Sequence, residues 1–545
     1  MAKTIRLSSV DAAFLYLETP ETPMHVGSLS LFKMPDGYTG NFFEAFKAQI
    51  ADRMDVAPML KRKLVPTLLD IDHPSWIEDD QFDLDRHVLR AGLPEPDDLA
   101  TLRRVVGWMH AKLLNRARPL WEFYVFDGLH DNLVGLYSKV HHSLIDGGAG
   151  VALTKIIYDV TANPPPRQRQ TADAGVETTD PDEERFGGLR AAGAALESYA
   201  RLWTRPLGSK PETFSLPRTG KSGLGPTLLD HALTQVETGV NAAAAFPAMA
   251  RAAAKALPGL LDVSKLGELR KLATPMTPLN RAISSERAFG ATTLSMSRAK
   301  AVGKAAGGKL NDVVLALSSG MLRRHLIAIG SLPDKSLSAA VPISLREEGN
   351  ADANNQVFSM ICQLATDVAD PRERMAAIIA DATRAKELVS PMKDFAPLMQ
   401  NISTLGAPMA MQMLAMVHAR SGLSDVMPPP ANVTISNVPG PRMTLYGAGA
   451  ELLHIWPVSI PAHGLALNIT VQSYRDNLEF GLVAGANVLP EVQGLADMLE
   501  EELVVLEKAF GLAEAPPAKA PAPKASRSAR RKSSKAGHAE TPPPI

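Results

Sequence analysis

The residues best suited to chemistry form one short stretch, in which His141 and His142 are followed by Asp146 and two glycines. A strand-like segment (132–140) precedes the stretch, and a helix-like segment (149–160) follows it. Because side chains alternate along a strand, two adjacent histidines at its end point in opposite directions. Only one of the two can therefore face a given cavity.

Gly147 and Gly148 allow a tight turn that could bring the carboxylate of Asp146 back toward the end of the strand. A neutral imidazole held there is suited to act as general base for a hydroxyl, because its pKa lies near the working pH. Spacing alone leaves two other interpretations open. The histidines could be a hydrogen-bonded structural pair, or part of a metal site for which Asp146 is the only further ligand nearby in sequence.

Composition places the chain among ordinary globular proteins with more than one domain. It has 545 residues, of which 45% are hydrophobic and 21% charged. The net charge of −1 argues against a dedicated nucleic-acid-binding protein. The single cysteine excludes an intrachain disulfide and a cysteine-based zinc site. The sequence predicts no secretory signal and no apolar run long enough to span a membrane, so we expect a cytoplasmic protein.

The pattern along the chain predicts four regions and an α/β fold. Residues 1–162 alternate strand-like and helix-like segments, and residues 277–512 do so again. Between them, 163–276 is expected to be a linker and helical connector, and 513–545 a disordered, basic Pro/Ala/Lys tail. The expected strands lie at 27–32, 132–140, 336–345, 432–438, 464–474 and 478–485, and the expected helices at 42–54, 99–114, 149–160 and 490–510.

Two basic segments are candidates for contact with lipid. The stretch 251–271 has basic residues beside apolar ones, so it could lie on a membrane surface or pack on its own protein. From residue 515 the tail carries seven basic residues and one acid. It could contact anionic headgroups or nucleic acid, or have no specific partner.

The chain resembles the bacterial wax ester synthase/diacylglycerol acyltransferase family, within the superfamily of acyl-CoA-dependent acyltransferases that carry an HHxxxDG signature. That signature is His141 to Gly147. The other matching segments follow in the family's order: LSSVDAAFL (7–15), PMHVG (23–27), RPLWE (118–122), TPLN (277–280), NDVVLA (311–316), VPISLR (341–346) and ISNVPGP (435–441).

The resemblance implies two domains like chloramphenicol acetyltransferase, each a mixed sheet with flanking helices, and an active-site tunnel at their interface. It implies transfer of a long-chain acyl group from coenzyme A to the hydroxyl of diacylglycerol or of a fatty alcohol. In the family the second histidine of the motif is the general base, so this role falls on His142, with His141 and Asp146 supporting its position. The coenzyme A thioester is a substrate, and no cofactor or metal is expected.

Five residues are candidates for substrate binding: Asn311, Gly147, Ser436, Asn437 and Trp121. Asn311 could donate a hydrogen bond to the thioester oxygen, or it could be a helix N-cap. Ser436 and Asn437 end an expected strand and could line the acyl-CoA side by analogy. Trp121 could anchor the core or contact a ligand. His25, before an expected strand, is interpreted as a structural, hydrogen-bonded residue, and Cys362 as a structural one.

Because both expected substrates are apolar, we expect peripheral contact with a membrane or lipid droplet, no nucleic-acid partner, and no predictable oligomeric state. Two alternatives remain. The protein could acylate another hydroxyl or an amine, or it could be a non-catalytic lipid-droplet protein that kept the fold. The intact HHxxxDG stretch disfavours the second alternative.

Overall fold

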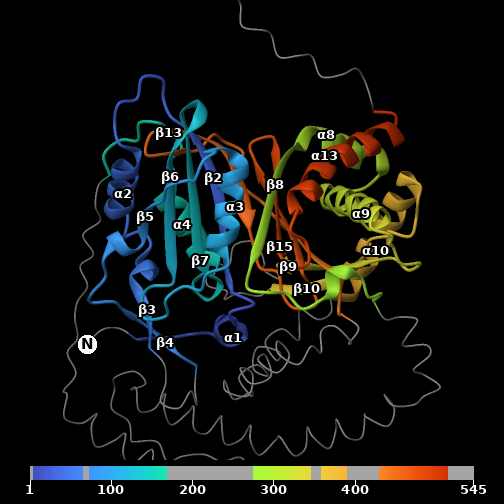
Figure 1. Cartoon of the computed structure of the whole chain (residues 1–545), viewed down its shortest axis with the longest axis horizontal. Coiled ribbons are helices and arrows are strands. Elements are labelled where there is room, and N and C mark those ends of the chain that lie inside the picture. Colours follow the sequence, from blue (N-terminus) through green and yellow to red (C-terminus); the bar gives the residue numbers. More distant parts are fainter. Residues whose placement is uncertain are drawn as a thin grey trace, which may run out of the picture.

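Two large β-sheets lie next to each other, each covered by helices, as the α/β prediction requires (Figure 1). The structure is a computed structural model that describes residues 4–65, 73–145, 147–167, 274–344, 357–389 and 429–512. The expected connector helix at 251–271, the tail at 513–545 and Asp146 lie outside the described residues.

The first sheet has six strands in the order β12-β13-β2-β7-β6-β5. Only β5 and β6 pair in parallel; the other neighbours are antiparallel. The strands are β2 (His25–Lys33), β5 (Val88–Arg90), β6 (Trp121–Leu129), β7 (Leu133–His141), β12 (Tyr446–Gly447) and β13 (Ala450–Val458). Its helices are α2 (Phe42–Asp52), α3 (Leu99–His110) and α4 (Gly147–Ile157).

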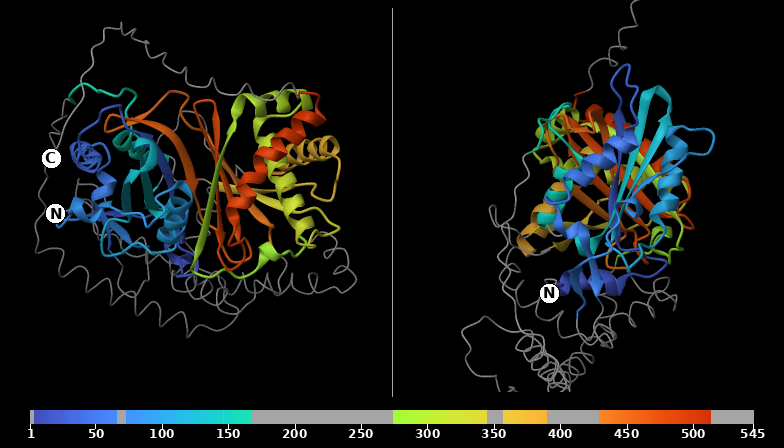
Figure 2. Two further views of the ribbon diagram at one scale, coloured as in Figure 1. Left: turned by 45° about the horizontal axis from the view of Figure 1, so that its top comes forward. Right: turned by 90° about the vertical axis from the view of Figure 1, so that its left-hand side faces the viewer.

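The second sheet has six strands in the order β10-β9-β11-β14-β15-β8, in which β11 runs parallel to both of its neighbours. The strands are β8 (Arg287–Ser295), β9 (Ser338–Ser344), β10 (Val357–Gln363), β11 (Val433–Val438), β14 (Leu467–Tyr474) and β15 (Asn477–Gly485). Four helices cover one face of it (Figure 2): α8 (Met296–Ala306), α9 (Leu310–Ala328), α10 (Pro371–Val389) and α13 (Val492–Ala509).

A small third sheet and a short helix complete the first half of the molecule. The sheet has the order β1-β4-β3, with β1 (Ile5–Arg6), β3 (Arg62–Val65) and β4 (Ser75–Glu78), and the helix is α1 (Ser9–Leu17). Polar side chains cap the helices that matter for the site. The hydroxyl of Ser8 accepts from the backbone N–H of Asp11 at the start of α1, and Asp98 does the same for Thr101 in α3.

The expected elements are present, with shifted ends. The expected helix at 99–114 stops at His110, and Lys139 of β7 donates to the carbonyl oxygens of Met109, near the end of α3, and of Lys112, just beyond it. The C-terminal part of the chain also completes the first sheet, since β13 pairs with β2. Residues 446–458 thus lie in the first sheet although their sequence range belongs to the expected second domain.

An apolar cluster joins the two halves. It includes Leu29 and Trp456 from the first sheet, Leu102 from α3, and Phe289 and Val483 from the second sheet. Since hydrophobic burial scales with the apolar area removed from water, this cluster holds the two sheets against each other.

At Gly481 of β15 the backbones of the two sheets approach each other closely. A Cβ atom built on Gly481 would lie 1.7 Å from the carbonyl oxygen of Pro457 in β13, so the backbone there must move to admit a side chain. We expect Gly481→Ala to lower the free energy of unfolding by about 2 kcal/mol or more, measured by denaturant titration. A matched control is Gly494→Ala in α13, where a Cβ meets nothing within 4 Å. That variant should be neutral or slightly more stable, and equal losses would contradict the prediction.

Candidate active site

His142 lies where β7 ends and a short 3₁₀ turn, η5 (His142–Leu144), begins. Its backbone N–H donates to the carbonyl of Met24 at 2.8 Å. The ring of Phe14 stacks on the imidazole with the ring centroids 3.9 Å apart and the planes 14° from parallel. The side chain is partly exposed, while Nδ1 is buried and has no hydrogen-bond partner in the part of the chain that the structure describes.

Burial lowers the pKa of His142 to about 4. The imidazole is therefore neutral near neutral pH, with one ring nitrogen free to accept a proton. A partly exposed imidazole that is unprotonated, and that is held by its backbone and by a stacked ring, can accept a proton from a hydroxyl, but its low pKa makes it a weaker base than an ordinary histidine.

His141 faces a different environment, as expected for neighbours at a strand end. Its side chain is 1% exposed. The backbone N–H of Ser143 donates to Nδ1 at 3.1 Å, so Nδ1 is an acceptor and Nε2 carries the proton. Nε2 lies 3.2 Å from a carboxylate oxygen of Glu18, which stands opposite it just after α1.

Glu18 is the residue that our sequence reasoning missed. Its side chain is 3% exposed and also binds Arg116 (Nη2 to Oε2, 2.9 Å) and the backbone N–H of Met24 (3.2 Å). Burial raises the pKa of Glu18, but the close contact with His141 and then the charge of Arg116 outweigh this effect and lower the pKa to about 2. Only its position before PMHVG could have been a signal, and Glu21 three residues later looks equivalent.

The other buried histidines near the site are structural. His25, paired with His141 across β2 and β7, has Nε2 2.5 Å from the carbonyl oxygen of His110, which confirms its expected role. The His110 ring bonds the hydroxyl of Tyr137 (2.7 Å) and the carbonyl of Ser459 (2.9 Å). Burial lowers the pKa of both histidines, that of His110 to about 3. These hydrogen bonds connect the end of α3 to β2, to β7 and to the segment that follows β13.

The structure brings Asn311 and Asn437 together. The side-chain nitrogen of Asn437, near the end of β11, lies 3.5 Å from the side-chain oxygen of Asn311, the second residue of α9. The N-cap interpretation of Asn311 is wrong, because Lys309 occupies that position and its backbone N–H donates to Asp312 (2.7 Å). Ser436 is half-buried on the same strand. Among the described residues no hydrogen bond joins this group to His142.

Trp121 lies in the core. It is 0% exposed, its indole N–H donates to the carbonyl of Leu60 at 2.7 Å, and His87 stacks on it at 4.5 Å. The geometry favours the core interpretation over ligand contact, because no ring surface remains exposed. Gly147 begins α4, immediately after the undescribed Asp146.

Cys362 is fully buried in β10, and burial raises the pKa of its thiol to about 11, which agrees with a structural role. The described residues contain no cluster of three or more His, Cys, Asp or Glu that could hold a metal ion. Within the same ranges, no helix combines the length and apolarity needed to cross a membrane.

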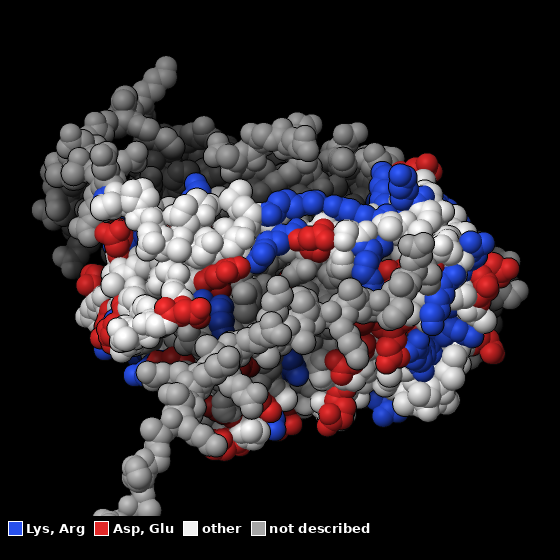
Figure 3. All heavy atoms as spheres, turned by 90° about the horizontal axis from the view of Figure 1, so that it is seen from above, with Lys and Arg blue, Asp and Glu red and all other residues white. Residues whose placement is uncertain are grey.

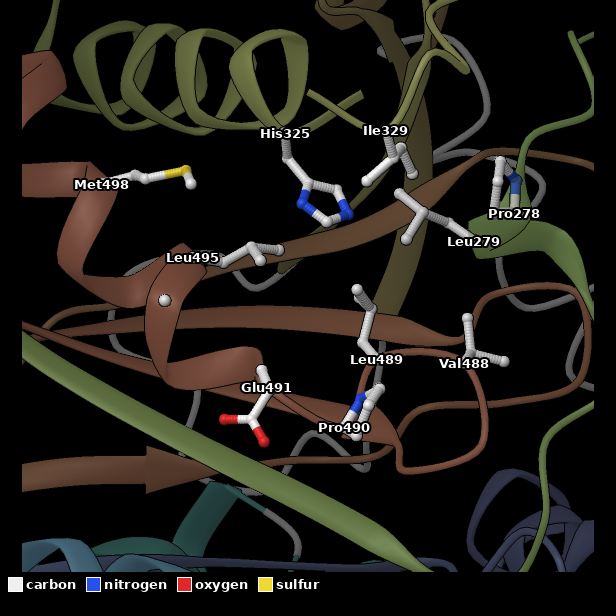
Figure 4. A pocket seen from close by; sticks show the side chains of 11 residues that line it. Pro278, Leu279, His325, Ile329, Val488, Leu489, Pro490, Glu491, Leu495 and Met498 are labelled. Atoms are coloured by element: carbon white, nitrogen blue, oxygen red, sulfur yellow. The ribbon is translucent and has the colours of Figure 1, made fainter. Parts of the chain in front are cut away.

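A separate pocket of about 340 Å³ lies in the second half of the molecule, between η6 (Pro278–Asn280), α9 and α13 (Figure 4). Apolar side chains such as Leu489 and Leu495 line it, together with His325 and Glu491. None of the HHxxxDG residues lines this pocket, so it is not where His142 would meet a substrate.

Family models match most of the chain. The wax ester synthase/diacylglycerol acyltransferase catalytic domain matches residues 7–314, and the C-terminal domain of the same family matches residues 353–507. The chain belongs to the wax ester synthase/diacylglycerol acyltransferase family. The resemblance drawn from the sequence is confirmed, and so is its implication that this family member is an acyltransferase.

Two relatives show how far the likeness extends. A Mycobacterium tuberculosis protein named "Probable diacyglycerol O-acyltransferase" is 35% identical over 92% of this chain and 98% of its own. The solved wax ester synthase/diacylglycerol acyltransferase from Marinobacter aquaeolei VT8 is 27% identical, with a TM-score of 0.61, and the match covers 93% of this chain and 100% of that one. The two-sheet α/β fold is therefore the fold of this family.

Proposed function

We propose that this family member moves a long-chain acyl group from coenzyme A to the hydroxyl of diacylglycerol or of a fatty alcohol, with His142 as general base. The observation that carries the proposal is the state of His142. It is partly exposed at the end of β7, Phe14 stacks on its ring, the Met24 carbonyl accepts from its backbone N–H, and burial lowers its pKa further, so the ring is unprotonated near neutral pH.

In the proposed step, His142 removes the proton from the acceptor hydroxyl as its oxygen attacks the thioester carbon. The C–O bond forms, and the carbon–sulfur bond then breaks. Coenzyme A leaves as its thiolate and takes back a proton from the imidazolium, which restores the base. Because Nδ1 is buried, we assign the proton transfer to Nε2. The step needs no nucleophilic side chain, and the buried Cys362 is unsuited to that role.

His141 and Glu18 are positioning residues in this proposal. The carboxylate of Glu18 accepts from the N–H of Met24, whose carbonyl accepts from the N–H of His142. Glu18 also faces His141, the residue directly before His142. It therefore restrains the backbone of the base from two sides. Asp146, outside the described residues, remains a proposed supporting residue, and Gly147 a proposed substrate-binding residue.

Asn311, with Asn437 and Ser436, is proposed to line the acyl-CoA side. The amide of Asn311 would donate to the thioester oxygen, where negative charge develops during attack. We expect Asn311→Ala to lower kcat by about a hundredfold while the KM for the acceptor changes little. Steady-state kinetics with varied acceptor would check this, and a loss confined to KM would contradict the donor role.

The low pKa of His142 predicts an unusual pH profile. A base must be neutral to act, so kcat/KM should rise with pH through the pKa of the free enzyme. With that pKa lowered from 6.5 to about 4, the profile should stay flat where an ordinary histidine would titrate. Initial rates measured between about pH 5 and 8 would test this, and half-maximal kcat/KM near the ordinary value would contradict it.

An acceptor panel tests the proposed function. Purified protein is incubated with radiolabelled long-chain acyl-CoA and either diacylglycerol or hexadecanol, and the esters are separated and counted. Triacylglycerol or wax ester formation supports the proposal, and the ratio of the two rates assigns the preferred acceptor. Absence of both esters would overturn it and favour another hydroxyl or amine acceptor, or the non-catalytic alternative.

Three further expectations remain proposals. Residues 1–162 and 277–512 would form the two acyltransferase domains, with β13 exchanged into the first sheet. The substrates would enter a tunnel at the interface of these domains. The protein would work in the cytoplasm and contact membrane or lipid-droplet surfaces peripherally, because its substrates are apolar.

A further inference from the structure

One face of α3 combines positive charge with an exposed aromatic ring. Arg104, Trp108 and Lys112 recur every four residues, so they line up along the same side of the helix and its C-terminal extension. All three are exposed, and Trp108, 58% exposed, is among the most exposed large apolar side chains described. The ammonium of Lys112 lies 3.3 Å from the centroid of the Trp108 ring.

The segment around this face has no acidic residue. From Leu99 to Trp121 it carries five basic residues: Arg103, Arg104, Lys112, Arg116 and Arg118. Two of these have acidic partners elsewhere. Arg103 experiences the charges of Asp98 and Asp497, and Arg116 pairs with Glu18. Arg104 and Lys112 form no ion pair with an acid in the part of the chain described, so their charge remains available to a partner.

Two exposed aliphatic side chains lie near the C-terminal end of α3 in the chain or through a contact of Arg116. Leu113 is 44% exposed and follows Lys112 directly. Leu17, at the end of α1, is 40% exposed and precedes Glu18, to which Arg116 binds. An amphipathic tryptophan with basic and aliphatic neighbours is the chemistry that binds the interface of a lipid surface carrying negative headgroups.

We propose that the α3 surface, defined by Arg104, Trp108, Lys112 and Leu113, docks on an anionic phospholipid surface. The proposed function includes peripheral contact with a lipid surface, and this inference names the part of the protein that makes the contact. It rests on the proposed function only in assuming that the substrates are apolar. The two regions that the sequence singled out for lipid contact, 251–271 and the tail, do not include this surface.

The end of α3 is linked to the motif that carries the proposed base. The carbonyl of His110, at the end of α3, binds His25, which pairs with His141. Helix α1 packs against η5, with Phe14 stacked on His142 and Leu17 exposed three residues further on. A lipid surface that meets α3 and the end of α1 would therefore lie next to the residues that hold His142.

A second basic surface provides a matched comparison. Seen from above, Lys and Arg side chains gather over the half of the molecule that carries α8 and α13 (Figure 3). Lys300 and Lys304 of α8 are exposed, but α8 has no exposed large apolar side chain. It therefore offers charge without the apolar contact that interfacial binding also needs.

The test measures binding of the full chain to vesicles of phosphatidylcholine, with and without phosphatidylglycerol, by co-sedimentation. The variants are Arg104→Glu/Lys112→Glu, Trp108→Ala and the control Lys300→Glu/Lys304→Glu, which changes the net charge by the same amount. We expect the wild type to prefer vesicles with phosphatidylglycerol. The first variant should bind them at least about tenfold more weakly and Trp108→Ala several-fold more weakly, while the control stays within about twofold.

Equal losses in the two charge-reversed variants would overturn the proposal, because net charge alone would then explain binding. Unchanged binding by Trp108→Ala would do so too. If the α3 variants instead lose binding to an oligonucleotide, or lose self-association in light scattering, with vesicle binding intact, the surface has another partner and the proposal fails. Turnover of a short-chain acyl-CoA and a short-chain alcohol in free solution is measured in parallel for each variant, and it should not change. Absence of this turnover in the wild type would count against the acyltransferase function and not against the lipid-binding surface.

Discussion

His142→Ala is expected to lower kcat by about 10² to 10⁴-fold, with much less change in KM, because the acceptor oxygen loses the base that removes its proton. The partly exposed ring contacts the aromatic face of Phe14, and its Nδ1 has no partner among the other described residues. Its removal should therefore cost little stability compared with removal of a core side chain. Rates with radiolabelled acyl-CoA and diacylglycerol, together with thermal unfolding of each variant, measure the two effects separately.

Two further variants show whether the loss of activity comes from losing the base at position 142. His142→Gln keeps a polar side chain of similar size but cannot act as a base near neutral pH, so it should be as inactive as the alanine variant. His325→Ala changes a histidine of α9 that lines the separate apolar pocket, and its kcat should stay within about twofold of the wild type. Unchanged turnover in both His142 variants would remove this residue from the mechanism, whereas the family membership would stand.

Glu18→Gln is expected to lower kcat by about 10- to 100-fold, because it weakens the restraints on His142 without touching the substrate. The change keeps the shape of the side chain but removes the charge that faces His141 and Arg116. A purely structural role would lower the unfolding temperature and leave the kcat of the folded fraction unaltered. A positioning role should also lower kcat per folded molecule and move the acid limb of the pH–rate profile.

The stability of the same variant has a defined dependence on pH. The pKa of Glu18 is lowered from 4.5 to about 2, so its charged form stabilises the fold above the unfolded-state value, by roughly 3 kcal/mol. This contribution is lost as the pH falls from 4.5 toward 2, and the difference in unfolding free energy between wild type and Glu18→Gln should shrink over that range. Glu21→Gln, three residues away, is the control. A kinetic loss of the same size in that control would contradict a specific role for Glu18.

The sequence by itself determined the fold class, the family and the motif that carries the proposed base. These follow from local information, because strand and helix patterns repeat over a few residues and the HHxxxDG spacing lies within one strand and one turn. Alternation along β7 predicted that His141 and His142 face different environments, and the structure places them against Glu18 and Phe14 respectively. The end of α3 was placed four residues too late, and the local pattern did not show that a lysine from a distant strand binds the carbonyl oxygens there.

Only the tertiary structure decided which distant residues support the site. Glu18 and Glu21 look alike in the chain, and the fold buries only the first of them against His141 and Arg116. The helix-start motif around Asn311 did not reveal that Asn437, more than a hundred residues later, would meet it. The lowered pKa of His142 likewise comes from burial. Each of these features depends on contacts between segments that are far apart in the sequence. Folding sets the solvation of a side chain and the charges around it, so the local sequence pattern does not reveal them.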